Sequence, residues 1–292
     1  MQMNFKETLK TEFKNIGIIL TERQAAQFEA FYNLLIEDNK KFNLTAITDI
    51  GGVIKKHFAD SVLLLKEFDI KQGAFVLDVG CGAGLPGLPI KILRPDIKLT
   101  LIDSVNKKVE FVNKVIAVLS LENAQALHGR AEYFANSLPL DASELQKPGC
   151  GGWLSAARPA PDGNLGGIHS KVPLCGGVAG ESPTGWSSPA VTRFLMREQF
   201  DYVLSRAVAP LNVLAEYCLP FVRLGGFMLA YKSVKTDEEL QAAQTIINLL
   251  GGKPETVIKI NVFDNGRSFV IIKKESPTPD IYPRKAKKIG KY

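Results

Sequence analysis

The sequence predicts an α/β protein, an open sheet of mostly parallel strands preceded by a helical extension. An apolar run at 75–79 leads directly into a glycine-rich turn and a helix-forming stretch at 86–94. A second apolar run, 98–103, ends in an acidic residue about twenty positions after the turn. Helical stretches and short apolar runs then alternate, as is typical of parallel strands joined by crossover helices. Seven strands are expected, the last antiparallel: 75–79, 98–103, 123–127, 200–205, 227–231, 255–261 and 267–273. After 86–94, helices are expected at 105–120, 210–222 and 236–249.

The glycine turn after the first strand is the first candidate binding element. Gly80 and Gly82 belong to a G-x-G-x-G-x-x-G run, where glycine permits positive φ and lets a ligand approach the backbone. The helix behind the turn begins with unpaired N–H groups. Asp103 ends the second strand, where a carboxylate can accept both ribose hydroxyls of an adenosine. An adenosine-containing ligand is therefore expected; alternatively, the glycines only form a turn and Asp103 caps the helix that begins near Val105.

The residue before the glycines bears on the kind of ligand. Asp78 lies at the end of the first strand, next to the turn. A carboxylate there suits a ligand that carries an ammonium or sulfonium group, and it would repel a pyrophosphate. This favours S-adenosylmethionine over NAD. The stretch also resembles the first motif of the Rossmann-like methyltransferases.

Composition limits the class of protein. With 292 residues, 46% hydrophobic and 23% charged, the chain has the composition of a soluble globular protein, and no apolar run is long enough to span a membrane. The first twenty residues do not predict a signal peptide. The four cysteines lie far apart, so neither a zinc site nor a disulfide framework is predicted, and we expect a cytoplasmic protein. The net charge of +6 favours a polyanionic partner, with nucleic acid as the leading candidate.

The pattern divides the chain into three parts. Residues 1–70 form the helical extension, 71–275 the sheet domain, and 276–292 a basic tail that is either solvated charge or a phosphate contact. In the extension, residues 21–24 resemble a capping box before a long amphipathic helix that extends to Asn39. Within the sheet domain, 136–193 breaks the alternation. Its portion 148–190 is rich in Gly, Pro and Ser and cannot bury enough apolar area to offset its ordering entropy. We expect a disordered or loosely ordered insertion there, without a metal site.

Other candidate residues lie outside the glycine turn. After the third strand, Glu132 or a nearby backbone amide is placed to bond the adenine amino group, with a helix cap as the alternative. After the fourth strand, Arg206 is placed to hold the methionine carboxylate or a phosphate, with a structural salt bridge as the alternative. His57 is a candidate base or RNA contact, and the alternative is a histidine hydrogen-bonded between helix and sheet.

The residues around the end of the fourth strand limit the methyl acceptor. The sequence Ser-Arg-Ala-Val at 205–208 does not resemble the (Asp/Asn)-Pro-Pro-aromatic turn that exocyclic amine methylation usually employs. Cytosine C5 methylation requires a nucleophilic cysteine, and neither Cys81 nor Cys218 is placed for attack. An acceptor that needs little activation remains, and guanine N7 fits because its lone pair is free. Catalysis would then be a positioning effect without a general base, and Arg206 is the one candidate for a catalytic role.

Six motifs occur in order along the chain: 42–45 (FNLT), 57–61 (HFADS), 78–89, 129–132 (GRAE), 205–207 (SRA) and 282–285 (YPRK). Together they resemble the bacterial small-subunit rRNA guanine-N7 methyltransferase family, RsmG, also called glucose-inhibited division protein B (GidB). The resemblance implies a Rossmann-like class I S-adenosylmethionine-dependent methyltransferase that modifies one guanine of 16S rRNA in the cytoplasm. By position, it implies cofactor contacts from five residues: Gly80, Leu85, Ala131, Glu132 and Arg206. We expect the small ribosomal subunit as partner, no membrane, and a monomer.

The insertion at 136–193 departs from the family, whose members pass from the third strand to the fourth in a short segment. Two alternatives therefore stay open. One is an RNA-binding protein whose methyl transfer is impaired by the insertion. The other is a small-molecule methyltransferase on the same fold, against which the basic helix at 105–120 and the basic tail argue.

Overall fold

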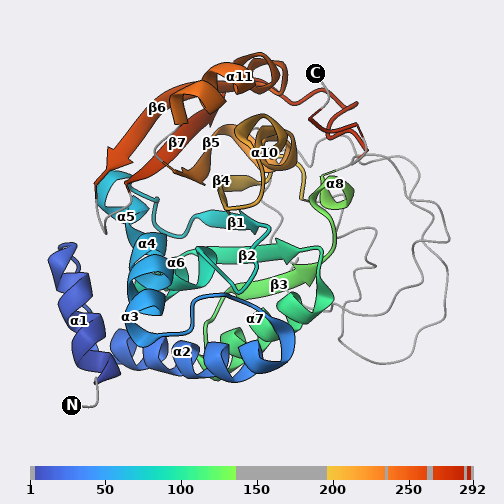
Figure 1. Ribbon diagram of the computed structural model, residues 1–292. Coiled ribbons are helices and arrows are strands. Elements are labelled where there is room, and N and C mark those ends of the chain that lie inside the picture. Colours follow the sequence, from blue (N-terminus) through green and yellow to red (C-terminus); the bar gives the residue numbers. More distant parts are fainter. Residues whose placement is uncertain (1–3, 136–195, 234–235, 262–265, 286–287, 291–292) are drawn as a thin grey trace, which may run out of the picture.

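The computed structural model describes residues 4–135, 196–233, 236–261, 266–285 and 288–290, and at its centre is a seven-stranded sheet (Figure 1). Its strands are β1 (Phe75–Val79), β2 (Lys98–Asp103), β3 (Ala124–His128), β4 (Phe200–Arg206), β5 (Val222–Lys232), β6 (Gly252–Ile260) and β7 (Arg267–Lys274). The order is β3-β2-β1-β4-β5-β7-β6, with β7 antiparallel to both neighbours and the pairs from β3 to β5 parallel. The predicted number of strands and the antiparallel last strand are confirmed.

The strand order fixes where a ligand would bind. From β1 the chain proceeds outward through β2 to β3, and it then returns to the other side of β1 to form β4. The crossovers on the two sides of this point turn in opposite directions. An open α/β sheet binds its ligand at the carboxyl ends of the strands where the order reverses, so the ends of β1 and β4 mark the site.

Helices cover both faces of the sheet (Figure 1). Side chains alternate along each strand, so apolar residues point to both faces and each face packs against helices. Val76 packs into a core with the N-terminal helices, and Leu77 packs into a second core on the opposite face. The first core holds α1 (Phe5–Asn15), α2 (Glu22–Phe42), α3 (Ile50–Gly52), the π-helix η1 (Val53–Ala59), α4 (Asp60–Val62), α5 (Leu64–Glu67), α6 (Gly87–Leu93) and α7 (Asn106–Val118). The second holds α8 (Ala131–Phe134), α10 (Leu211–Cys218), the 3₁₀ turn η3 (Leu219–Phe221) and α11 (Thr236–Leu249).

The helical extension shares its core with the sheet domain. Thr21 begins α2 with the predicted capping box, in which its hydroxyl accepts from the Gln24 N–H and the Gln24 side chain accepts from the Thr21 N–H. The buried Phe31 ring lies 5.1 Å from the ring of Phe58 on η1 and 6.4 Å from that of Phe111 on α7. The extension is thus held against the sheet by ring packing that buries large apolar areas.

Two expectations about the chain after β4 were wrong. The helix expected over 210–222 ends at Cys218, because Pro220 cannot donate to a helical ladder and Val222 instead pairs with Phe200. The strand expected over 227–231 accordingly begins at Val222, and its register shifts before Phe227. The π-helix at 53–59 was not expected at all.

Part of the sequence prediction lies outside the described residues. The expected insertion at 136–193 falls there, as do its two cysteines and its histidine. Residues 262–265, between β6 and β7, also lie outside the described residues, and the two strands pair antiparallel. Among the described residues, no helix combines the length and the apolar character that crossing a bilayer requires.

Candidate active site

The loop between β1 and α6 presents bare backbone at the carboxyl edge of the sheet. Gly80, Gly82 and Gly84 all have positive φ, at 73°, 57° and 84°. A Cβ on Gly80 would lie 2.6 Å from Cγ2 of Val208, whereas a Cβ on Gly82 would meet no atom within 4 Å. Leu85 is buried in the same loop, and its N–H donates to the Cys81 carbonyl at 2.9 Å. The backbone at Gly82 therefore faces space that a ligand can enter.

Asp103 lies where the sequence predicted it and is bonded to the glycine loop. Its Oδ2 accepts from the Gly82 N–H at 2.9 Å, and its Oδ1 accepts from the Val105 N–H at 2.9 Å. Val105 is the N-cap residue of α7, and no side chain caps that helix. The bond from Val105 to Asp103 therefore forms a turn before the helix, and the cap that the sequence left as the alternative is not present. Each carboxylate oxygen has a second lone pair, so the same residue can still accept from ribose hydroxyls.

Asp78 is a buried carboxyl beneath the loop. Its Oδ2 accepts from the Gly87 N–H at 2.8 Å, while its Oδ1 is buried and has no hydrogen-bond partner among the described residues. Burial raises the pKa of Asp78 to about 7, and the Gly87 hydrogen bond and the Arg206 charge oppose that rise. A positive charge bound nearby would stabilise the ionised carboxylate.

Arg206 ends β4 and is anchored through one of its nitrogens. Its Nη1 donates to Asp60 Oδ2 at 2.9 Å, to the Lys56 carbonyl at 3.3 Å and to Ser61 Oγ at 3.4 Å. The salt bridge that the sequence left as the alternative is therefore present. A guanidinium has five N–H donors, and no described residue accepts from Nε or Nη2 of Arg206. One side of the group is held while the other keeps donors for an anion.

Asp60 is the centre of this arrangement, and the sequence reasoning did not single it out. It is only 3% exposed, and its second oxygen accepts from Nε of Arg267 at the start of β7. One buried carboxylate on α4 thus joins arginines from two strands. A lone acid within the apolar stretch 58–65 was the signal that could have marked it, because a buried carboxylate needs a cationic partner.

His57 lies on the π-helix next to this cluster. Its Nε2 is 2.7 Å from Thr45 Oγ1, and its Nδ1 is buried without a hydrogen-bond partner among the described residues. Burial, together with the charge of Arg206, lowers the pKa of His57 to about 4. The ring is therefore neutral at pH 7. The ring is hydrogen-bonded to Thr45 within the helical extension. This is close to the alternative reading of the sequence, a histidine hydrogen-bonded between helix and sheet.

The loop after β3 adjoins Asp103. The Gly129 N–H donates to the Asp103 carbonyl at 3.0 Å, and α8 then begins at Ala131. Glu132 is buried there, with Arg130 Nη1 3.7 Å from its Oε1. The predicted residues of β1, β2 and β3 therefore follow one another along the carboxyl edge.

The two described cysteines are buried thiols. Burial raises the pKa of Cys81 and that of Cys218 above the usual range for a thiol. Neither is a thiolate at neutral pH, so neither is ready for nucleophilic attack.

The sheet order, its antiparallel β7 and the glycine loop define the Rossmann-like class I fold of S-adenosylmethionine-dependent methyltransferases. The family model described as rRNA small subunit methyltransferase G (GidB) matches residues 24–143 and 190–267. The chain belongs to this family. The residues between the two matched segments, 144–189, fall inside the predicted insertion.

Three curated relatives are named ribosomal RNA small subunit methyltransferase G. The protein from Desulforamulus reducens is 41% identical over 281 residues, covering 96% of this chain and 94% of the relative. Those from Lachnoclostridium phytofermentans and Clostridium kluyveri are 38% and 33% identical, covering 97% and 99% of this chain and 94% and 98% of the relatives. Among solved structures, an S-adenosylmethionine-dependent methyltransferase from Aquifex aeolicus is 16% identical with a TM-score of 0.44, and the match covers 81% of this chain and 97% of that one. This similarity is too distant to bear on function.

Proposed function

We propose that this chain transfers the methyl group of S-adenosylmethionine to N7 of a guanine in 16S rRNA of the small ribosomal subunit. Family membership supports the reaction and the kind of RNA. The single structural observation that supports it most is Arg206, anchored through Nη1 to buried Asp60 at the edge where the glycine loop opens.

The residues of the carboxyl edge fit this cofactor chemically. In the proposal, Asp103 accepts from the ribose hydroxyls, and the backbone at Gly80, Gly82 and Leu85 lies against the ligand. Ala131 and Glu132 border the adenine, because their loop is bonded to Asp103.

The two charged groups nearest β1 and β4 fit the amino-acid end of the cofactor. Arg206 keeps N–H donors that suit the methionine carboxylate, and Asp78 offers a carboxyl for the positively charged end. Because Arg206 is close enough to lower the pKa of Asp78, the two groups act on the same region.

The mechanism needs little more than positioning. The cofactor, when bound, supplies an electrophilic methyl group on a sulfonium. Guanine N7 presents its lone pair without losing a proton, so the protein must hold N7, the methyl carbon and the sulfur in line. Cys81 and Cys218 are not thiolates at neutral pH, and Nδ1 of His57 is buried. These three residues therefore offer neither a nucleophile nor an accessible base, which agrees with an acceptor that needs no activation.

The parts of the chain take distinct roles in this proposal. Residues 71–275 form the methyltransferase domain, and the extension 1–70 orients Arg206 through Asp60. The tail 276–292 contacts RNA. We also propose that the protein acts as a monomer, and we place it in the cytoplasm with the ribosome.

The test is methyl transfer from labelled S-adenosylmethionine to small subunits from a bacterial strain that lacks the modification. Strand cleavage specific for N7-methylguanine should then locate one labelled position in 16S rRNA, and free guanosine should take up no label. Arg206→Gln should lower transfer at limiting cofactor. No label in the RNA, or label at another atom of the base, would contradict the proposal.

A further inference from the structure

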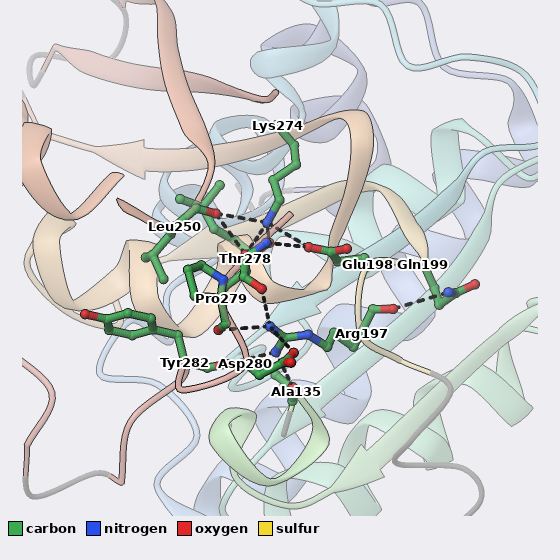
Figure 2. A network of polar contacts seen from close by, with 11 residues as sticks. Ala135, Arg197, Glu198, Gln199, Leu250, Lys274, Thr278, Pro279, Asp280 and Tyr282 are labelled. Atoms are coloured by element: carbon green, nitrogen blue, oxygen red, sulfur yellow. Dashed lines mark hydrogen bonds and ion pairs between the residues drawn. The ribbon is translucent and has the colours of Figure 1, made fainter. Parts of the chain in front are cut away.

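The chain after β7 is bound to the body of the protein instead of leaving it. Arg197 Nη1 donates to the carbonyls of Ala135 at 2.9 Å and Tyr282 at 2.8 Å. Its Nη2 donates to those of Thr278 at 2.6 Å and Pro279 at 3.2 Å. Figure 2 shows this one guanidinium between the C-terminal segment and the end of α8.

A second buried cation holds the start of the same segment. Lys274 Nζ donates to the carbonyls of Leu219 at 2.9 Å and Leu250 at 3.0 Å, and it pairs with Glu198 at 3.3 Å (Figure 2). Glu198 also accepts from the Thr278 N–H at 2.7 Å. Burial lowers the pKa of Lys274 to about 8, so the ammonium is the main form at neutral pH. The segment therefore leaves β7 along a fixed path.

The segment then runs along α10 in a direction that the contacts define. Arg284 pairs with Glu216 through Nε at 3.0 Å and Nη2 at 2.7 Å, and its own N–H donates to Glu216 at 2.7 Å. Glu216 is fully buried in the second half of α10. Gly290 lies beside Val213 in the first turn, where a Cβ on the glycine would be 2.8 Å from Cγ2 of Val213. The described residues of the segment thus pass from the second half of α10 toward its first turn.

This direction matters because α10 begins at the active edge of the sheet. Only residues 207–210 separate Arg206, the end of β4, from the first residue of α10. The helix also packs against α8, which carries Glu132 and follows the exposed Arg130. The end of the segment therefore lies beside the edge that holds the candidate cofactor residues.

In the last part of the segment, residues 282–285 and 288–290, both exposed side chains are lysines, whereas the exposed acids Glu275 and Asp280 lie earlier in the segment. Lys285 and Lys288 are exposed, and neither forms an ion pair with a described residue. Some other exposed lysines do pair, as Lys259 does with Asp237 at 2.6 Å. Two unpaired ammonium groups on an anchored backbone match the regular negative charge of a phosphodiester chain.

We propose that the described residues 282–285 and 288–290 form a phosphate-binding strap that holds the RNA backbone beside the active edge. This inference rests on the proposed function, since it names the part of the chain that holds the same substrate. Anchoring by Arg197 and Arg284 orders the strap before RNA binds, so little backbone entropy is lost on binding.

The test is binding of small subunits as a function of salt, with the full-length protein. Lys285→Gln combined with Lys288→Gln should weaken binding and should lower the slope of log K against log[salt] by about 1.5, because two phosphate contacts are lost. The KM for the subunit should rise while the affinity for S-adenosylmethionine and the melting temperature stay unchanged. The matched control is Lys71→Gln with Lys98→Gln, two exposed lysines at the opposite edge of the sheet, which should leave the slope unchanged.

The outcomes separate the strap from the proposed function. An unchanged slope in the double variant, or an equal change in the control, would overturn the strap even if the wild-type protein methylates the subunit. A reduced slope without methylation by the wild-type protein would support the strap and contradict the proposed function. Glu216→Gln provides a second variant, since loosening Arg284 should weaken RNA binding while both lysines remain.

Discussion

Replacing Asp60 with asparagine should weaken cofactor binding without touching the cofactor. The carboxylate accepts from Arg206 Nη1 at 2.9 Å and from Arg267 Nε, and it is almost fully buried. Asparagine keeps one acceptor oxygen, but its amide N–H group faces a guanidinium. Hydrogen bonds to charged groups contribute about 1.5–3 kcal/mol to stability. We use the lower half of this range because the Arg267 side chain is one-third exposed. The free energy of unfolding should therefore fall by about 2 kcal/mol in Asp60→Asn.

The effect on binding follows from the loosened arginine. Ordering a long side chain costs about 0.5–1.5 kcal/mol, and Arg206 would have to be ordered again by each bound ligand. The dissociation constant for S-adenosylmethionine should therefore rise by about threefold to tenfold. Calorimetric titration measures this change, and thermal unfolding measures the loss of stability.

A matched pair at the other end of β4 serves as the control. Asp201 is equally buried and accepts from Arg223 Nε at 2.6 Å, at the edge away from the glycine loop. Asp201→Asn should also lower stability, but the affinity for the cofactor should not change. An unchanged dissociation constant in Asp60→Asn, or the same rise in Asp201→Asn, would refute the positioning role of Asp60.

Three further predictions concern the loop, a buried acid and a buried histidine. Gly82→Ala and Gly73→Ala each place a Cβ in open space on a residue with positive φ, so each should lower the stability by about 1 kcal/mol. Only Gly82→Ala should also lower the affinity for S-adenosylmethionine, by tenfold or more in a calorimetric titration. The pKa of Asp78 is about 7, and a cationic ligand favours its ionised form, so the affinity for S-adenosylmethionine should rise from pH 6 to pH 7.5. An affinity that does not change with pH in the wild-type protein would count against a role of Asp78 in cofactor binding. So would a pH dependence that remains in Asp78→Asn. The pKa of His57 is about 4 in the folded protein and 6.5 in the unfolded chain, so between these pH values the unfolded state binds more protons. The free energy of unfolding should therefore fall as the pH is lowered from 6.5 to 4, by at most about 3 kcal/mol. His57→Gln should flatten that part of the stability curve measured by denaturant titration, and an identical curve would disprove the assignment.

Local signals explain what the sequence predicted well. The strand at 98–103 was placed to the residue, because an apolar run between polar ends is compatible with a buried strand and with little else. The capping box at Thr21 was predicted from spacing alone, since its hydrogen bonds join residues three positions apart. Asp78 and Asp103 were singled out by a similarly local signal, because each is an acid at the carboxyl end of an apolar strand pattern.

Contacts between distant residues explain what the sequence did not predict. Asp60, Arg206 and Arg267 come together from a helix and two strands, and no local pattern carries that information. Val222 begins a strand because Phe200 lies opposite it, which overrides the helical pattern that precedes it. The path of the C-terminal segment likewise depends on Arg197, which is far from it in the sequence.

Calorimetric titration with S-adenosylmethionine tests whether the edge formed by the glycine loop, Asp103 and Arg206 binds the cofactor. The purified protein is compared with a variant from which residues 138–193 are deleted. The hydrogen bond from Arg197 to Ala135 closes the base of that segment, so the deleted form should keep its fold. We expect one binding site of micromolar affinity in both proteins, and this binding should be lost or weakened in Gly82→Ala. Binding by the deleted form alone would mean that the segment disables this chain, and binding by neither would contradict the assignment of the cofactor site.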